Sequence, residues 1–482
     1  MLNELKTHKY IIGIVIAATI LRTWMLQTKA IFFGDAARDL FVARTSLLTR
    51  TLPLLGIPSS VPRFHQGPVT IWIEMLTLFF SRNSTLAVSC VFAFISIAAV
   101  ISVYELLALS MKPRIGIFAA FFLAFSPLAI AHGRVPYHIT PIPFVVTLYF
   151  ISLFFLWKKK KNALFFAVFA FCFMFQFELA LTPLILLLPY VLARTKELKK
   201  AHIRLIARQS IPAFLIGLLP ELIFDVTHHF AQLGGFAVWL VYRSVAFFGY
   251  KHDHTFSFHQ LFETLAQLKI FFERIVSVDT VWLSLLFLGV IFFGFRIFFI
   301  HRKKSVFPPI LELTLLATGL LFIGDIVHSS PSEAYFPPFF ILFAILFGFA
   351  CEQIWIHSQW GKKLLPLFFI VFAVTNTVEI FHANFFASTA SAFSYGPSIG
   401  EQREVVQKIA QLSHKRFQFA TLNESGKFPT YFDNLRWLAL EKGLSEDTVH
   451  GTVFYIENKN SLLQTNPSIT RYSFPSLDVY TK

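Results

Sequence analysis

Residues 141–161 read PIPFVVTLYFISLFFLWKKKK, an apolar run that ends in four consecutive lysines. The apolar part is about as long as the shortest helix that crosses the hydrocarbon core of a bilayer. Lysines directly after such a run are typical of the cytoplasmic end of a span, because basic loops tend to stay inside the cell. This stretch therefore predicts both a membrane span and its direction.

The rest of the chain has the same character. Of its 482 residues, 55% are hydrophobic and 14% are charged, whereas soluble domains carry roughly 25% charged residues. Phe occurs 61 times, which favours a lipid-facing surface. The formal net charge of +15 comes mostly from short basic clusters between apolar runs, which indicates loop charge and no nucleic-acid partner. Cys90, Cys172 and Cys351 all lie in apolar runs, so we expect neither a disulfide framework nor a cysteine metal site.

Eleven apolar runs are long enough to predict membrane-spanning helices. They lie at about 10–28, 86–109, 115–131, 141–157, 162–177, 178–193, 210–224, 281–300, 307–327, 337–357 and 364–382. A twelfth run, residues 68–80, has 13 residues and is too short to cross comfortably. The predicted fold is therefore an all-α polytopic membrane protein.

Charge decides what the short run 68–80 does. If it does not cross, the inner loops hold 19 Lys and Arg residues and the longer outer loops about 11. If it did cross, every later loop would change sides and Lys158–Lys161 would lie outside. We therefore expect a re-entrant or interfacial helix there, a cytoplasmic N-terminus and an extracytoplasmic C-terminus.

The first outer loop, residues 29–85, contains the sequence GDAARD. Asp35 and Asp39 are four residues apart, so on a helix they share a face, with Arg38 beside them. One interpretation is that Asp35 caps the helix that follows Gly34. The other is a chemical role at the membrane surface, and a cap does not exclude it.

Two later outer segments carry clustered polar residues. Residues 132–140 hold Arg134, Tyr137 and His138, which are suited to binding a phosphate or simply to a polar turn punctuated by proline. The stretch PELIFDVTHHF places Glu221, Asp225 and His228 at a helix end. It lacks an HExxH pattern, so its spacing does not favour a metal site.

The remaining candidate functional features are single acidic residues near the ends of predicted spans, and the C-terminal tail. Glu178 lies at a tight outer turn, where a carboxylate is expected to face the bundle interior. Glu333 and Tyr335 lie in the last outer loop. From about residue 398 the composition changes, and two helix-like and two strand-like stretches predict a small α/β unit of about 85 residues. This tail is expected either to cover the site or to bind the acceptor, or to be a passive cap.

The order of these motifs resembles the GT-C glycosyltransferases that use lipid-linked sugars. The nearest resemblance is to glycosyltransferase family 39, the protein mannosyltransferase-like group, with the lipid A aminoarabinose transferases as relatives. It covers roughly residues 1–385, with residues 386–482 as the tail. The matching stretches are GDAARD, HQGPVTIW with His65, GRVPYHITPIP, PELIFDVTHHF and EAYFPPFF. One departure is that many members have Asp-Glu in the first loop, whereas here Ala36 follows Asp35 and leaves Asp39 as the only substitute.

The resemblance implies a reaction at the outer face of the cell membrane. A polyprenyl-phosphate sugar would be the donor, and a protein, lipid or glycan hydroxyl the acceptor. Asp35 would act as general base, with Asp39 as the second acid. Arg134, assisted by Arg38, Tyr137 or His138, would stabilise the phosphate. The other implied cavity residues are His65, Glu178, Glu221, Asp225, His228, Glu333 and Tyr335. No cofactor is expected, and dependence on a divalent metal stays open.

Two other functions fit a polytopic membrane protein. A lipid or sugar transporter, or a flippase, would suit many spans and intramembrane acids. No internal inverted repeat is evident, and the long polar loops lie on one side, which disfavours a transporter. A polysaccharide ligase or polymerase would differ mainly in its donor. The sequence shows no Rossmann fingerprint and no P-loop, in agreement with a donor that is not a soluble nucleotide sugar.

Overall fold

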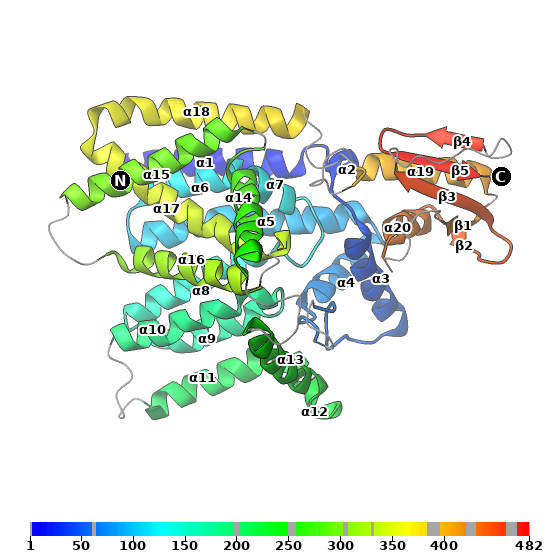
Figure 1. The fold of residues 1–482 in the computed structure, drawn as a ribbon, viewed down its shortest axis with the longest axis horizontal. Coiled ribbons are helices and arrows are strands. Elements are labelled where there is room, and N and C mark those ends of the chain that lie inside the picture. Colours follow the sequence, from blue (N-terminus) through cyan, green and yellow to red (C-terminus); the bar gives the residue numbers. More distant parts are fainter. Residues whose placement is uncertain are drawn as a thin grey trace.

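The structure is a computed structural model, and it divides into a helix bundle and a small C-terminal unit (Figure 1). It describes residues 2–59, 64–195, 203–248, 257–278, 280–301, 307–328, 332–382, 396–413, 415–420, 430–458 and 470–481. The C-terminal unit lies at one end of the bundle, which we call the tail end, and the opposite end is the far end. The predicted inner basic residues at 196–200 and 302–304, and the predicted boundary at residue 385, lie outside the described residues.

A helix or helix pair occupies each of the eleven predicted spans. These are α1 (Leu2–Thr23), α5 (Thr85–Ser110), α6 (Pro113–Phe125) with α7 (Pro127–His132), α8 (Ile142–Trp157), α9 (Ala163–Met174), the 3-10 helix η1 (Leu179–Leu186) with α10 (Leu187–Arg194), α11 (Ile203–Gly217) with α12 (Leu219–Thr227), α15 (Val281–His301), α16 (Pro309–His328), α17 (Pro337–His357) and α18 (Gln359–His382). In Figure 1 the long helices run side by side along one axis.

The polytopic membrane fold is thus confirmed, although the helices differ in length. Among the described residues, five helices are long and apolar enough to cross a membrane alone, and six if the bent pair α11–α12 counts as one span. The helices α6, α8, α9 and η1–α10 are apolar but shorter. That these shorter helices cross the membrane stays a prediction from the sequence.

Prolines explain two of the breaks in the bundle. Pro220 stands in the first turn of α12, where its ring and missing N–H prevent α11 from continuing, and the two helices meet at 74°. Pro127 separates α6 from α7 in the same way. Arg22 of α1 donates to the freed carbonyls of Leu123 and Ala124 at 3.0 and 3.2 Å. The broken backbone is therefore satisfied inside the bundle, as a membrane interior requires.

Helix α17 lies at the centre of the bundle and packs against α6, α15, α16 and α18. Phenylalanines fill much of this core: the rings of Phe122, Phe287 and Phe347 lie with centroids 4.9–5.4 Å apart. The abundance of Phe therefore serves the interior as well as the lipid-facing surface. At the far end, buried Glu352 of α17 lies 3.5 Å from Lys112 and 2.9 Å from Arg114, which join α17 to α6.

Shorter helices gather where the outer segments were predicted. They are α2 (Leu26–Lys29), α3 (Gly34–Thr49), α4 (Val69–Ser81), α13 (Ala231–Phe247), α14 (Phe258–Val276) and the single turn η3 (Glu333–Tyr335). Helix α4 is the short run expected to be interfacial; its 13 residues span about 20 Å, less than the ~30 Å core. Helices α13 and α14 lie inside the segment predicted as loop, and α14 crosses the bundle axis in Figure 1.

The tail is an α/β unit, as expected. It contains α19 (Ile399–Leu412), β1 (Arg416–Ala420), α20 (Asp433–Glu441), β2 (Ser445–Glu446), β3 (Thr452–Asn458), β4 (Thr470–Ser473) and β5 (Leu477–Thr481). The strands form one sheet in the order β2-β1-β3-β5-β4, with β1 parallel to β2 and β3 and the other pairs antiparallel. Strands β2, β4 and β5 are additional to the prediction.

Candidate functional site

A charged cluster on α3 lies at the tail end of the bundle. Arg38 donates through Nε and Nη2 to Oδ1 of Asp39 at 3.0 and 2.8 Å. Its Nη1 lies 3.4 Å from Oδ1 of Asp35. Asp39 is completely buried, whereas the side chains of Arg38 and Asp35 are 26% and 41% exposed. The i, i+3 and i, i+4 spacing predicted from the sequence therefore produces one cluster, with Asp35 at its open side.

A further acid, Glu74 of α4, belongs to the same cluster. It is fully buried, and among the described residues neither carboxyl oxygen has a hydrogen-bond partner. Burial raises the pKa of Asp39 to about 7, against the opposing pull of Arg38. Burial, and then the charge of Asp39, raise the pKa of Glu74 well above its ordinary value. The sequence offered a signal for Glu74 that the prediction missed: it is the one charged residue in an apolar helix.

Tyr137 and His138 reach this cluster from the turn between α7 and α8. The ring of Tyr137 lies 5.0 Å from that of Phe33, just before α3, and 4.0 Å from that of His138. Burial raises the pKa of Tyr137, and the negative charges of Asp35 and Asp39 raise it further. The tyrosine hydroxyl therefore stays neutral beside the carboxylates.

His138 links the cluster to Glu178. Its Nε2 lies 3.5 Å from Oε2 of Glu178, and the same oxygen accepts a hydrogen bond from Gln66 at 3.0 Å. The other carboxyl oxygen accepts from the backbone N–H of Ala180 at 3.1 Å and so caps η1. Burial lowers the pKa of His138, although Glu178 opposes the shift. Glu178 faces the protein interior, as the sequence predicts.

The tail covers the open side of α3. Thr430 donates through Oγ1 to Oδ1 of Asp35 at 2.9 Å. A Cβ atom on Gly34 would lie 1.9 Å from the carbonyl oxygen of Thr430, so this approach requires glycine. Trp437 and Glu441 of α20 bind the hydroxyl of Thr85 at the start of α5, at 2.8 and 2.5 Å. The tail is thus fixed to the bundle directly above Asp35.

Glu221, Asp225 and His65 belong to a neighbouring network. Gln176 donates to Oε1 of Glu221 at 2.7 Å and to the carbonyl of Gly217, at the break between α11 and α12, at 3.0 Å. Asp225 accepts from the first N–H groups of α13, those of Gln232 and Leu233, at 2.8 and 3.1 Å. The side chain of Gln232 in turn binds the backbone of His65. Asp225 therefore serves as a helix cap.

His228, Glu333 and Tyr335 have other surroundings. The ring of exposed His228 stacks on Phe224 with centroids 4.0 Å apart. Glu333 accepts from Arg274 of α14 at 3.1 Å and pairs with His132 at 2.8 Å. The ring of Tyr335 contacts that of His328. These contacts of the three predicted residues lie outside the α3 cluster.

Arg134 lies at the tail end with only 1% of its surface exposed. Its Nη1 donates to the carbonyl of Leu21 at 3.0 Å, and its Nη2 donates to those of Trp24 and Lys29 at 2.9 and 3.4 Å. The guanidinium thus binds carbonyls at the end of α1, in the turn beyond it and at the end of α2. Its predicted role on the donor phosphate stays a prediction. Within the described residues, no group of three or more His, Cys, Asp or Glu side chains is placed to hold a metal ion.

Comparisons with known proteins agree with this architecture. Residues 65–223 match the model of the dolichyl-phosphate-mannose-protein mannosyltransferase family. The chain resembles ArnT from Cupriavidus metallidurans in the apo state, with a TM-score of 0.60 and 11% identity over 100% of this chain and 98% of that one. It also resembles the same protein bound to undecaprenyl phosphate, with a TM-score of 0.57 and 12% identity over 98% and 97%. No curated protein sequence matches the chain.

Proposed function

We infer that this protein is a membrane glycosyltransferase of the GT-C superfamily, and we propose that it transfers a sugar from a polyprenyl-phosphate donor to an acceptor hydroxyl at its tail end. The observation that carries the proposal is the α3 cluster. In it a partly exposed carboxylate, Asp35, lies beside a cation, Arg38, at the tail end of the helix bundle and beneath the covering tail. A lipid-linked donor needs such a position, because its polyprenyl chain stays in the bilayer while its sugar extends out of the bilayer.

In the proposed reaction Asp35 is the general base. It takes the proton from the acceptor hydroxyl while the hydroxyl oxygen attacks the anomeric carbon of the sugar. The bond between that carbon and the phosphate oxygen breaks, and the lipid phosphate leaves with the electron pair. Attack opposite the leaving group inverts the anomeric configuration. Thr430 and Arg38 hold Oδ1 of Asp35 and so fix the direction of the carboxylate.

Arg38 is the proposed partner of the leaving phosphate. It is 26% exposed, and its guanidinium already lies against carboxylates, so negative charge is accommodated next to it. A planar guanidinium suits two phosphate oxygens at once. His138, with a pKa lowered by burial, would act as a neutral hydrogen-bond donor near this position. The predicted contribution of Arg134 requires that it exchange a backbone carbonyl for the phosphate.

The comparisons support the donor class. The ArnT structure with which this chain shares its fold over nearly its full length was obtained bound to undecaprenyl phosphate. The family model that matches residues 65–223 is named for a dolichyl-phosphate sugar donor. We therefore propose a polyprenyl-phosphate sugar here as well. A protein, a lipid and a glycan remain the three candidate acceptor classes.

A transfer assay tests the reaction directly. The full chain, reconstituted in nanodiscs, is given synthetic polyprenyl-phosphate hexoses and a panel of hydroxyl acceptors, and the product is measured by mass spectrometry. We expect transfer from a lipid-linked donor and none from a soluble nucleotide sugar. Transfer from the nucleotide sugar alone would overturn the donor class. Movement of the lipid-linked sugar across a liposome membrane without transfer would instead support the flippase alternative.

We further propose that the tail end faces the outside of the cell membrane. The Lys158–Lys161 turn lies at the far end, and basic loops favour the cytoplasm. In a variant without native cysteines, Lys160→Cys should be protected from an impermeant thiol reagent added to intact cells. Ser445→Cys, in the tail, should react. The opposite labelling pattern would place the reaction on the cytoplasmic side.

A further inference from the structure

A basic pocket lies at the far end of the bundle, on the side opposite the α3 cluster. It has a volume of about 880 Å³ and is formed where the turn between α8 and α9 meets the end of α10 and the start of α11. Its lining residues are Leu156, Lys159, Lys160, Lys161, Asn162, Leu164, Phe165, Phe166, Leu192, Ile206, Arg208 and Gln209. Among these described residues, four are basic and none is Asp or Glu. The pocket therefore favours an anion.

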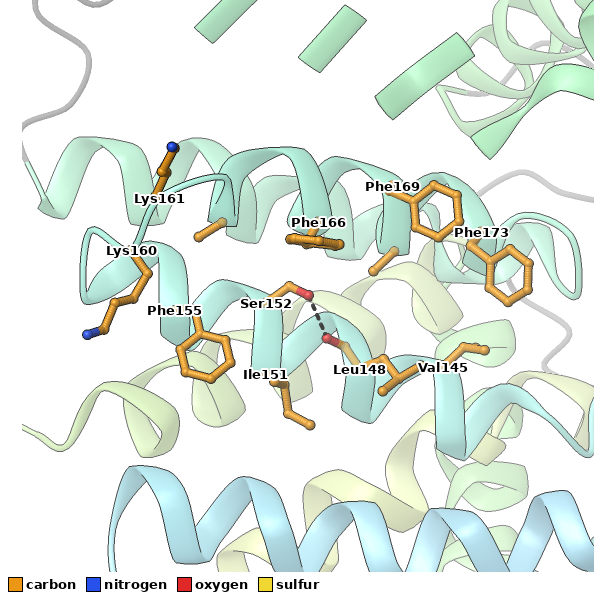
Figure 2. A pocket seen from close by; sticks show the side chains of 12 residues that line it. Val145, Leu148, Ile151, Ser152, Phe155, Lys160, Lys161, Phe166, Phe169 and Phe173 are labelled. Carbon is orange, nitrogen blue, oxygen red and sulfur yellow. Dashed lines mark hydrogen bonds between the residues drawn. The ribbon is translucent and has the colours of Figure 1, made fainter. Parts of the chain in front are cut away.

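An apolar groove continues from this pocket between α8 and α9. Its volume is about 550 Å³, and it shares Lys160, Lys161 and Phe166 with the basic pocket. Figure 2 shows Lys160 and Lys161 at one end, with apolar side chains such as Leu148 and Phe169 along its length. The two cavities together have a cationic mouth and an apolar channel, so they suit an amphipathic anion.

The local backbone explains why the lysines gather at the mouth. The turn between α8 and α9 is tight, with Lys159 and Asn162 both in the left-handed region at φ of 54° and 61°. It therefore presents consecutive lysine side chains at one helix end. Like charges at this spacing repel one another, and a bound anion would relieve that repulsion.

Other basic residues at the far end have acids beside them. Arg194 pairs with Glu312 at 3.0 Å, and Arg114 pairs with Glu352 at 2.9 Å. These pairs join helices and need no outside anion. In the part of the chain that the structure describes, Lys160, Lys161 and Arg208 line the pocket, and its lining includes no Asp or Glu.

The length of the groove indicates what kind of anion fits. Its α9 lining runs from Ala163 to Phe173, about 15 Å at 1.5 Å per residue. That is the depth of one bilayer leaflet, half of a core about 30 Å thick. The groove is lined by side chains that remain exposed in the isolated chain, Phe166 by 55% and Phe155 by 36%. A nucleotide or an acidic peptide would leave this apolar surface unused.

We propose that an anionic phospholipid of the leaflet at the far end binds here, with its phosphate on Lys160, Lys161 and Arg208 and one acyl chain in the groove. The site is separate from the proposed reaction at the tail end. A bound lipid would join α8, α9 and α11 through contacts that the chain does not make alone, and so stabilise the bundle. Basic pockets at a membrane boundary recognise acidic lipid headgroups by this combination of charge and depth.

Lipid binding to the full chain in detergent tests the proposal. Phosphatidylglycerol, phosphatidylcholine and inorganic phosphate are each titrated, with bound lipid followed by native mass spectrometry and unfolding by thermal shift. We expect phosphatidylglycerol alone to bind one molecule tightly and raise the unfolding temperature. Lys160→Gln with Lys161→Gln should weaken this binding roughly 25-fold, the effect of about 1 kcal/mol per lysine.

A matched control removes two lysines at the same end of the bundle. Lys362→Gln with Lys363→Gln changes the net charge equally but leaves the pocket intact, so phosphatidylglycerol binding should be unchanged. Lys160→Arg with Lys161→Arg keeps both positive charges and should retain binding. That result would show that the turn still folds when its lysines are replaced. Phosphatidylglycerol with long acyl chains should bind more tightly than phosphatidylglycerol with short ones. Filling the groove by Ala170→Phe should remove that difference.

Three results would overturn the proposal. Equal stabilisation by inorganic phosphate would make this a phosphate site with no lipid role. Equal loss in the Lys362/Lys363 control would reduce the effect to surface charge. Equal binding of phosphatidylcholine would show that the basic mouth selects nothing.

Discussion

Arg38 and Arg134 were both expected to bind the donor phosphate, and the structure gives them opposite surroundings. Arg38 lies against two carboxylates, is 26% exposed and sits beneath the tail. Arg134 is 1% exposed, and backbone carbonyls occupy its terminal nitrogens. Burial lowers its pKa to about 10, which still leaves it charged at neutral pH. One arginine therefore faces groups that can change partners, and the other holds α1 in place.

Two properties explain why the two arginines differ: the groups that each guanidinium binds, and the exposure of those groups. A guanidinium has five donors, and buried carbonyls that lose it have no replacement. Asp35, which is 41% exposed, can be rehydrated or can exchange the guanidinium for a substrate, whereas Asp39 is completely buried. The partner and its exposure, more than the charge, therefore separate a structural arginine from one available for chemistry.

The largest expected effect comes from the acid beside Arg38. Asp35→Asn keeps an acceptor for Thr430 and for Arg38 but cannot take a proton, so kcat should fall by about 10²–10⁴ with an unchanged unfolding temperature. Glu404→Gln, on an exposed face of α19, is the matched control and should keep full activity. Wild-type turnover in Asp35→Asn would reduce this aspartate to a structural role and leave Asp39 as the next candidate.

The carboxyl groups around Arg38 should change their charge with pH, whereas the backbone carbonyls that bind Arg134 should not. Glu74 has a folded-state pKa well above its unfolded value. Its contribution to stability is complete below the unfolded pKa and is lost as pH rises toward the folded one, by about 1.4 kcal/mol per pH unit. Glu74→Gln cannot ionise, so its unfolding temperature should exceed that of the wild type by a margin that grows with pH. A constant margin from pH 5 to 8 would contradict the buried, protonated state.

Removing Arg38 should weaken use of the donor. Arg38→Ala loses a charge-assisted contact of about 1.5–3 kcal/mol, so the apparent donor constant should rise roughly 10–150-fold. Arg38→Lys should recover part of this, because an ammonium cannot make the planar two-point contact. The acceptor constant, measured in the same nanodiscs, should change little. An unchanged donor constant would remove Arg38 from the phosphate site.

Removing Arg134 should act on stability instead. Arg134→Ala removes the donor from the buried carbonyl of Leu21 and from the part-buried carbonyl of Trp24, and one unsatisfied buried group costs about 1–3 kcal/mol. We expect a lower unfolding temperature, with the donor constant of the folded fraction unchanged. The reverse outcome, normal stability with a raised donor constant, would restore Arg134 to the phosphate site and would erase the contrast with Arg38.

Much of the bundle follows from local sequence. Apolar runs predicted where the helices lie, because a bilayer requires long apolar segments. Asp35, Arg38 and Asp39 were predictable as a cluster, since helix spacing alone brings them together. The lone acid of α4, Glu74, carried a usable signal as well.

Contacts between distant segments left no such signal. The carbonyls that Arg134 binds at Leu21, Trp24 and Lys29 lie more than a hundred residues earlier in the chain. Glu333 meets His132 and Arg274 from two other segments, so one group of predicted residues separates into several sites. Such pairings depend on how the helices pack against one another, and no local sequence pattern predicts that packing.

The smallest expected effect concerns the tail. Thr430 lies 395 residues from Asp35 in sequence and donates a single hydrogen bond to it. Thr430→Val keeps the shape but loses the donor, and one such bond contributes about 0.5–1.5 kcal/mol, so kcat should fall roughly two- to tenfold. Because the hydroxyl would orient the proposed base without contacting the donor, the donor constant and the unfolding temperature should stay the same. Thr430→Ser should restore kcat, and Thr470→Val on exposed β4 should not change it. If Thr430→Val turned over as fast as the wild type, the tail would cover Asp35 without positioning it, and the reactive geometry would belong to α3 alone.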